Sequence, residues 1–203
     1  MQLKPATFPS LGVDCITALD SVRCAALKAA GIGFAVRYLG SLGALETNAI
    51  LNSGLGLMTV GYSRAPGWVP TAGMGAADGM QDVQHYHNAG LMVGSTVWID
   101  LEGCAGTVDQ ATGWIEERAT VLHSAGMDVG LYVGAYQPLG ATQLYALPSI
   151  DRYWRSLSSG VPEPACGWSM VQLYKTVVIG GTEVDVDVVQ YDHKYRLPMM
   201  VTQ

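Results

Sequence analysis

Four stretches of the chain repeat one pattern, in which a helix-like segment ends in Ala or Ser, a glycine follows, and an apolar, strand-like segment begins within a few residues. They are KAAGIGFAVRYLG (28–40), LNSGLGLMTVGYS (51–63), HNAGLMVGSTVWI (87–99) and HSAGMDVGLYVGAY (123–136). Glycine just past a helix provides the left-handed cap without steric cost. The pattern therefore predicts helices that are followed at once by strands, as in βαβ units around a parallel sheet. The cap residues would be Gly31, Gly54, Gly90 and Gly126.

Eight strands follow from this pattern and from the apolar runs after it. We predict them at 11–16, 33–38, 56–62, 95–101, 129–135, 152–157, 168–174 and 184–190. Helices connect the first five, and the helical signal weakens after Leu147. The predicted fold is an α/β protein, a (β/α)8 TIM-like barrel with reduced helices in the C-terminal third. An open, doubly wound sheet is the alternative.

The length and charge of the chain limit the functions that it can have. Its 203 residues suit a single catalytic-type domain, 1–203, with a core at about 11–192. A formal net charge of −6 without any basic run argues against nucleic acid as a partner. No apolar run approaches the roughly 20 residues of a membrane helix. Neither GxGxxG nor GxxxxGK[ST] is present, so we expect no cofactor. We also expect a monomer.

Cysteine and histidine give no sign of a metal site. The cysteines show neither a CxxC motif nor zinc-like spacing, and a domain of this size does not need cross-links, so we expect buried free thiols. His85 and His87 lie two apart on a predicted helix and therefore face different ways.

The stretch WIDLEG (98–103) places two carboxylates at the end of an apolar strand. Side chains alternate along a strand, so Asp100 and Glu102 share the face opposite the apolar Ile99 and Leu101. The apolar face suits the helix layer, which directs both acids into the barrel mouth, where barrel enzymes build their sites. Burying such charges would be costly without compensation.

Further acids are expected at the same mouth. In LGVDCIT, Asp14 lies near the end of the first strand, and in GTEVDVDVVQYD the acids alternate with valines. The first and eighth strands of a closed barrel are neighbours, so Asp14, Asp185 and Asp187 would join Asp100 and Glu102. Neighbouring carboxylates raise one another's pKa, which suits proton donation in glycosidic bond cleavage. Mg²⁺ or Ca²⁺ held by Asp14, Asp100, Asp185 and Asp187 is the alternative.

Aromatic side chains at strand ends favour a sugar ligand, because sugar rings stack on aromatic faces. Filling of the barrel core is the alternative for each of them. Arg37 could either contact substrate or pair with an acid inside the barrel. The aromatic candidates are Tyr38, Tyr62, Trp98, Tyr132, Tyr136 and Tyr174.

These motifs together resemble a known family. GVD, VRYLG (36–40), WIDLEG, MVQLY (170–174) and VDVD (184–187) resemble the glycoside-hydrolase-like barrels of the domain-of-unknown-function family 1906. More distantly, they are similar to the family 25 lysozymes. The resemblance spans about residues 11–192. It implies that Glu102 is the general acid, Asp100 its partner carboxylate, and Asp14 and Asp185 further acids of the cleft. Asp187 stands where family 25 has an Asn-like residue.

The resemblance implies a peptidoglycan hydrolase that cleaves the β-1,4 bond between N-acetylmuramic acid and N-acetylglucosamine. The start, MQLKPATFPS, lacks the apolar core of a signal peptide. We therefore expect synthesis in the cytoplasm and action at the bacterial cell wall after release by a holin or a secretion system, as a phage endolysin or an antibacterial effector. A glycan-binding barrel without turnover and a hydrolase of another glycan are the alternatives.

Overall fold

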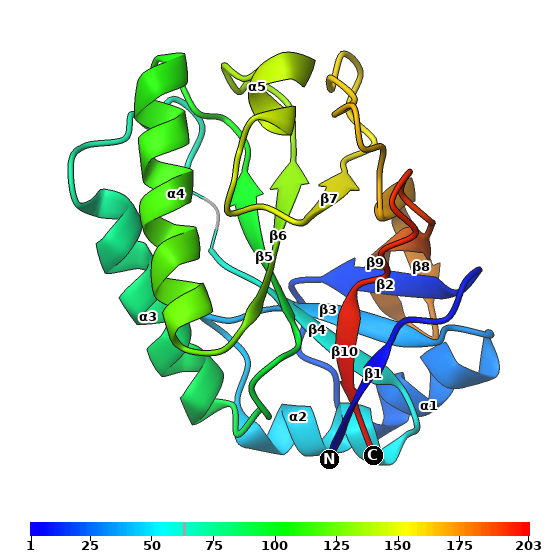
Figure 1. The fold of residues 1–203 in the computed structure, drawn as a ribbon. Helices are drawn as coiled ribbons and strands as arrows, with labels where there is room; N and C mark the ends of the chain where they lie inside the picture. Colours follow the sequence, from blue (N-terminus) through cyan, green and yellow to red (C-terminus); the bar gives the residue numbers. More distant parts are fainter. Residues whose placement is uncertain (63) are drawn as a thin grey trace.

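Eight strands of the described chain close into a barrel, as predicted. The structure, a computed structural model, describes residues 1–62 and 64–203. Each strand pairs with its neighbour around the ring, and the pairing of β4 with β5 closes it. Figure 1 shows β5 and β6 side by side, running toward α5, with β7 next to β6. The barrel strands are β2 (Leu11–Cys15), β3 (Phe34–Tyr38), β4 (Gly56–Val60), β5 (Thr96–Leu101), β6 (Asp128–Val133), β7 (Arg152–Arg155), β8 (Met170–Ile179) and β9 (Thr182–Val189).

The last strand runs against the others, which corrects the expectation of an all-parallel barrel. β9 is antiparallel to both β8 and β2, whereas β2 to β8 are parallel. Only Gly180 and Gly181 separate β8 from β9, with φ of 56° and 78°. Such a pair forms a tight hairpin and is far too short for a parallel crossover. As a result, the start of β9 lies at the end of the barrel where β2 finishes.

Helices cover the first part of the barrel and shrink later, as predicted. The expected cap residues Gly31, Gly54, Gly90 and Gly126 all have positive φ, between 69° and 88°. No helix separates β7 from β8 in the described chain, and no described helix is long and apolar enough to cross a membrane. The helices are α1 (Ser21–Ala29), α2 (Ala44–Asn52), α3 (Met74–Asn88), α4 (Val108–Ser124) and α5 (Ala141–Tyr145).

Two short strands add to the sheet beyond the expected core of 11–192. β1 (Gln2–Pro5) pairs antiparallel with β10 (Met199–Thr202), which contacts β4 through Val201 and Leu57. The two chain ends consequently lie together (Figure 1). Four-residue strands carry too little periodicity to be recognised in a sequence.

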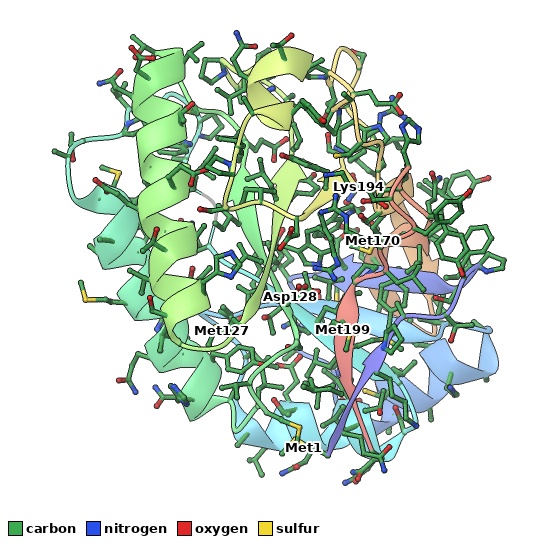
Figure 2. All side chains as sticks on the ribbon, in the orientation of Figure 1. Met1, Met127, Asp128, Met170, Lys194 and Met199 are labelled. Carbon is green, nitrogen blue, oxygen red and sulfur yellow. The ribbon has the colours of Figure 1, made fainter. Side chains whose placement is uncertain are left out.

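The apolar side chains form two layers, one on each face of the barrel wall. The outer layer packs the strands against the helices and includes Val97, Ile99 and Leu101 of β5. The inner layer fills the barrel, and Met170, labelled in Figure 2, belongs to it. The interior is therefore a packed core, and a ligand can bind only at its ends. Its members are Ala6, Phe34, Val36, Met58, Val60, Trp98, Tyr132, Trp154, Met170 and Val189.

Candidate functional site

The alternation of side chains along β5 places its acids on the inner face. Trp98 belongs to the inner layer, so Asp100 points the same way two residues later, and Glu102 follows just past the strand. Asp100 is buried, with 4% of its surface exposed. Glu102 is half-buried. Both acids thus lie at the carboxyl end of β5, as predicted.

A glycine directly after the next strand, β6, leaves room for the Glu102 side chain. The side chain of Glu102 lies over Gly134, where an added Cβ would come within 2.6 Å of the Glu102 Cβ. The Ala135 amide donates to Glu102 Oε1 at 3.3 Å, and the Trp68 indole donates to the Glu102 carbonyl at 2.8 Å. Backbone and side chain of Glu102 are therefore fixed from two directions.

If Glu102 is the general acid that the resemblance implies, replacing Gly134 by Ala should displace it and reduce hydrolysis about 100-fold, because misplacing a reacting group by about 1 Å costs that much. The added methyl group should also lower the free energy of unfolding by about 1–3 kcal/mol. Gly113→Ala is the matched control, since Gly113 lies in α4 and an added Cβ there would meet nothing within 4 Å. Initial rates with a purified cell-wall substrate measure the effect. Equal activity of the two variants would contradict the role of Gly134.

The acids of β2 and β9 lie opposite each other across the strand pair. Asp14 pairs in register with Asp185, and both side chains accept from the Gln172 Nε2 of β8, at 3.1 and 3.0 Å. The Thr176 amide also donates to Asp185 Oδ1 at 2.8 Å. Because β9 runs in reverse, its early residues rather than its late ones reach the mouth. Gln172 thus joins two strands and fixes both carboxylates.

Two tyrosines show that the acids of β2, β5 and β9 share one site. Burial first, and then the charges of Asp14, Asp100, Glu102 and Asp185, raise the pKa of Tyr38 above its usual value. Burial first, followed by the charges of Glu102, Asp100 and Asp14, likewise raises the pKa of Tyr132. A charge raises a pKa in this way from nearby, so Tyr38 lies near acids of β2, β5 and β9, and Tyr132 near acids of β5 and β2.

Asp14 is the acid whose ionisation falls near neutral pH. Its side chain is buried, and burial, ahead of the Asp185 charge, raises the pKa of Asp14 to about 7. The hydrogen bond from Gln172 acts in the opposite direction. Removing water disfavours the charged form of a carboxyl, and a like charge adds to that effect.

The structure does not bring Arg37 to the mouth. Arg37 precedes Tyr38 and therefore faces the helix layer, where it is fully buried. Its Nε bonds Glu46 Oε1 at 2.7 Å, and its other nitrogens bond the carbonyls of Cys15 and Ile16. The hydrogen-bond donors of Arg37 thus bind acceptors of α2 and of the end of β2. The side chain stabilises the fold and does not face the site.

The predicted aromatic residues divide into three groups. Trp98 is fully buried and packs edge-on against Trp154, with ring centroids 5.7 Å apart, so it fills the core and offers no face to a sugar. Tyr132 and Tyr38 lie between this core and the acids. The other three are exposed, and they are Tyr62, Tyr136 and Tyr174.

Two hollows adjoin at the mouth. A pocket of about 260 Å³ is lined by Asp14, Asp185 and Tyr38, and a cleft of about 900 Å³ continues from it toward α3. Tyr38 and Ile16 line both. Tyr62 stands in the wall of the larger cleft. Tyr136 lines a separate hollow beside Gly103, so the structure does not group it with the other aromatic candidates.

Binding of Mg²⁺ or Ca²⁺ by these acids is the alternative use of the site, and the arrangement of the acids does not support it. Within residues 1–62 and 64–203, no group of three His, Cys, Asp or Glu side chains is arranged to hold a metal ion. The Gln172 amide nitrogen lies between Asp14 and Asp185 and donates to both. A hydrogen-bond donor thus stands between the two carboxylates where a cation would have to bind. The four cysteines are buried and free, as predicted.

Several residues of the site were not predicted from the sequence. Gln172 had a visible signal, since it is the polar residue in MVQLY and interrupts an apolar strand. Gly134 and Trp154 had none, because their partners, Glu102 and Asp187, are far away in the chain. Asp187 was expected at the mouth with the other acids. It is instead fully buried below the mouth, where its side chain cannot contact a substrate.

Comparison with solved structures shows similar folds. The Tat-secreted protein Rv2525c of Mycobacterium tuberculosis, solved with L-tartrate, is 15% identical, with a TM-score of 0.69 over 89% of this chain and 95% of that one. A family 25 glycosyl hydrolase from Bacillus anthracis is 14% identical, with a TM-score of 0.60 over 89% and 88%. The modular autolysin LytC of Streptococcus pneumoniae, solved with a synthetic peptidoglycan ligand, is 13% identical, with a TM-score of 0.67 over 90% of this chain and 47% of that one.

The family assignment comes from the sequence itself. Comparison with curated protein sequences finds no significant match. A model of the family described as "Rv2525c-like, glycoside hydrolase-like domain" matches residues 25–193, most of the chain. The resemblance to glycoside-hydrolase-like barrels that the motifs indicated is thereby confirmed. The chain belongs to the Rv2525c-like family of glycoside hydrolase-like domains.

Proposed function

We propose that this protein is a peptidoglycan hydrolase of the muramidase type, which cleaves the β-1,4 bond between N-acetylmuramic acid and N-acetylglucosamine. The observation that carries the proposal is the grouping of acids from three strands: Asp14 and Asp185 line one pocket with Tyr38, and Asp100 pairs in register with Tyr132. A set of carboxyl groups in different environments is what glycosidic cleavage requires. The autolysin with a similar fold, solved with a peptidoglycan ligand, supports this substrate class.

In this proposal Glu102 is the general acid. It stands at the edge of the site, half-buried, and Gly134 and the Ala135 amide hold its carboxyl group. Protonated Glu102 gives its proton to the glycosidic oxygen as the bond to the sugar carbon breaks. Ionised Asp100, on the same face of β5, stabilises the positive charge that develops on the sugar ring. Water then adds to the sugar carbon and gives a proton to the Glu102 carboxylate, which restores the acid.

Substrate binding is assigned to the cleft next to the acids. Tyr62 is 67% exposed in its wall, and Tyr38 joins the cleft to the acidic pocket. Aromatic rings beside polar groups suit sugar rings, which stack on the former and hydrogen-bond to the latter. At about 900 Å³ the cleft has room for more than one sugar, which suits a polymer.

Mass analysis of digested peptidoglycan tests the bond that is cleaved. Purified cell walls are incubated with the protein, the soluble fragments are reduced with borohydride, and their masses are determined. We expect fragments that end in reduced N-acetylmuramic acid. Reduced N-acetylglucosamine at the fragment ends would identify a different glycosidase, and free peptides would point to amide cleavage instead.

A glycan-binding barrel without turnover is the second candidate. It is favoured by the position of the larger cleft, because neither Glu102 nor Asp100 is among the described residues that line it. This candidate predicts that the protein co-sediments with cell walls and releases no new reducing ends. The same incubation therefore separates the two functions.

A peptidoglycan substrate also sets the place of action. We propose that the protein acts at the bacterial cell wall, as an endolysin or as an antibacterial effector. Expression in the cytoplasm of a host with and without a co-expressed holin tests this. Lysis that depends on the holin is expected, whereas no lysis in either case would contradict it.

A further inference from the structure

Asp187 and Asp14 are buried neighbours on the inner face of the barrel. Gly12 faces Asp187 in the register of β2 and β9, and Asp14 faces Asp185 one step nearer to the mouth. Asp14 and Asp187 are therefore diagonal neighbours on the same face of the strand pair. Asp187 is 0% exposed and Asp14 is 7% exposed, so neither carboxyl relies on bulk water.

The hydrogen-bond donors around Asp187 are too few for an ionised carboxylate. The Trp154 indole donates to Asp187 Oδ1 at 3.0 Å. Among the described residues, none donates to Asp187 Oδ2, which is buried. The Asp187 carboxyl also shares a side-chain hydrogen bond with the carboxyl of Asp14. Two ionised carboxylates cannot bond each other, so one of them must carry the proton.

The surrounding charges do not replace that proton. The cation that acts on Asp14 is Lys175 of β8, whose side chain is exposed and bonds Ser158 Oγ at 3.5 Å. Arg37 lies on the opposite face of the wall. Among the described residues, the other groups found next to the pair are neutral or acidic, and they are Gln172 of β8, Trp154 of β7, Asp185 of β9, Tyr38 of β3 and Tyr132 of β6.

We propose that Asp187 and Asp14 share one proton beneath the mouth, and that Asp187 is thereby the residue that positions Asp14. The Asp187 carboxyl keeps the proton and donates it to an Asp14 oxygen, while the Gln172 amide holds the other side of Asp14. Asp14 then faces the site in a fixed orientation although a second acid lies directly below it. The positioning role rests on the proposed function, whereas the shared proton does not depend on it.

The direction of the pH effect follows from the burial of the pair. Burial, ahead of the Asp14 charge, raises the pKa of Asp187 well above its usual value. In the unfolded chain an aspartate loses its proton near pH ~4. The folded state thus binds a proton that the unfolded state does not, and the stability that this proton confers is lost as the pH rises through the folded pKa.

Asp187→Asn tests the shared proton, because Asn can accept from Trp154 and donate to Asp14 as a protonated Asp187 would, but it cannot ionise. Denaturant unfolding is measured for both proteins between ~pH 5 and ~pH 8. The ratio of the wild-type unfolding constant to that of the variant should rise about tenfold per pH unit, as expected for one proton. A ratio that does not change with pH overturns the proposal. Glu163→Gln, at an exposed acid in the loop between β7 and β8, is the control and should give no trend.

A second measurement does not depend on the variant's folding. Infrared spectra of the wild-type protein at neutral pH should show the carbonyl stretch of a buried, protonated carboxylic acid, and its absence overturns the shared proton. Rescue by the isosteric variant tests the positioning role. Asp187→Asn, which can still donate to Asp14, should keep most of the hydrolysis that Asp187→Leu loses, and an equal loss in the two variants overturns that role. The unfolding and infrared results need no substrate, so they stand whether or not the protein proves to be a hydrolase.

Discussion

Glu102→Gln should reduce the release of reducing ends from purified peptidoglycan by about 10²- to 10⁴-fold, the usual contribution of a general acid. Gln has the shape of Glu and retains an oxygen that can accept from the Ala135 amide. The side-chain amide of Gln is not acidic and cannot transfer a proton to the glycosidic oxygen. The free energy of unfolding should change little, because Glu102 is half-buried at the edge of the site.

The matched control for this experiment is Glu163→Gln, at an exposed acid in the loop between β7 and β8. It makes the same chemical change away from the mouth and should leave the rate unaltered. Equal release by Glu102→Gln and the wild-type protein would remove Glu102 from the mechanism.

Glu46→Ala should destabilise the fold by about 3–5 kcal/mol, because it leaves the buried guanidinium of Arg37 without its carboxylate. Glu46 Oε1 accepts from both Arg37 Nε, at 2.7 Å, and the Leu19 amide, at 2.8 Å. For a chain of this length the melting temperature should fall on the order of 10 °C. Thermal unfolding followed by circular dichroism measures the shift.

Asp151→Ala is the control for the buried pair. Asp151 forms an ion pair with Arg196 at 3.2 Å, but its side chain is 55% exposed. An exposed pair contributes about 0–1 kcal/mol, so the melting temperature should hardly move. Similar shifts in the two variants would show that the Arg37–Glu46 pair does not brace the end of β2.

Much of the barrel could be predicted because its signals are local. The helices α1 to α4 are each followed by a glycine whose positive φ was expected, and the barrel strands show a period of two that separates the inner from the outer face. The same period placed Asp100 and Glu102 on the inner face. The reversal of β9 was missed although its signal, the pair Gly180–Gly181, is also local. A two-residue glycine turn should outweigh a fold-level expectation of parallel strands.

The period of two also explains the error at Arg37. Tyr38 and Arg37 are consecutive in β3, so they cannot both face the interior. Because Tyr38 faces the interior, Arg37 faces the helix layer. Its carboxylate partner there is Glu46 of α2. Gln172 could have been found in the same way, as a polar residue at an inward position of β8.

Other parts of the site depend on contacts that no local pattern reveals. Gly134 matters because Glu102 lies over it, and Asp187 because its donor, Trp154, comes from another strand. Trp98 was grouped with the sugar-binding aromatics, since an inward strand position suits both the core and a ligand. Whether such a side chain fills the core or reaches a ligand depends on its distance from the end of the barrel. That distance depends on the register of all the strands together.

The most direct test of the acidic mouth as the place of glycan cleavage is a crystal structure of Glu102→Gln with a bound peptidoglycan fragment. We expect a sugar ring beside Tyr38 and a glycosidic oxygen within hydrogen-bond distance of the substituted side chain. A fragment that binds only in the cleft toward α3, with every glycosidic oxygen out of reach of residue 102, would contradict the account.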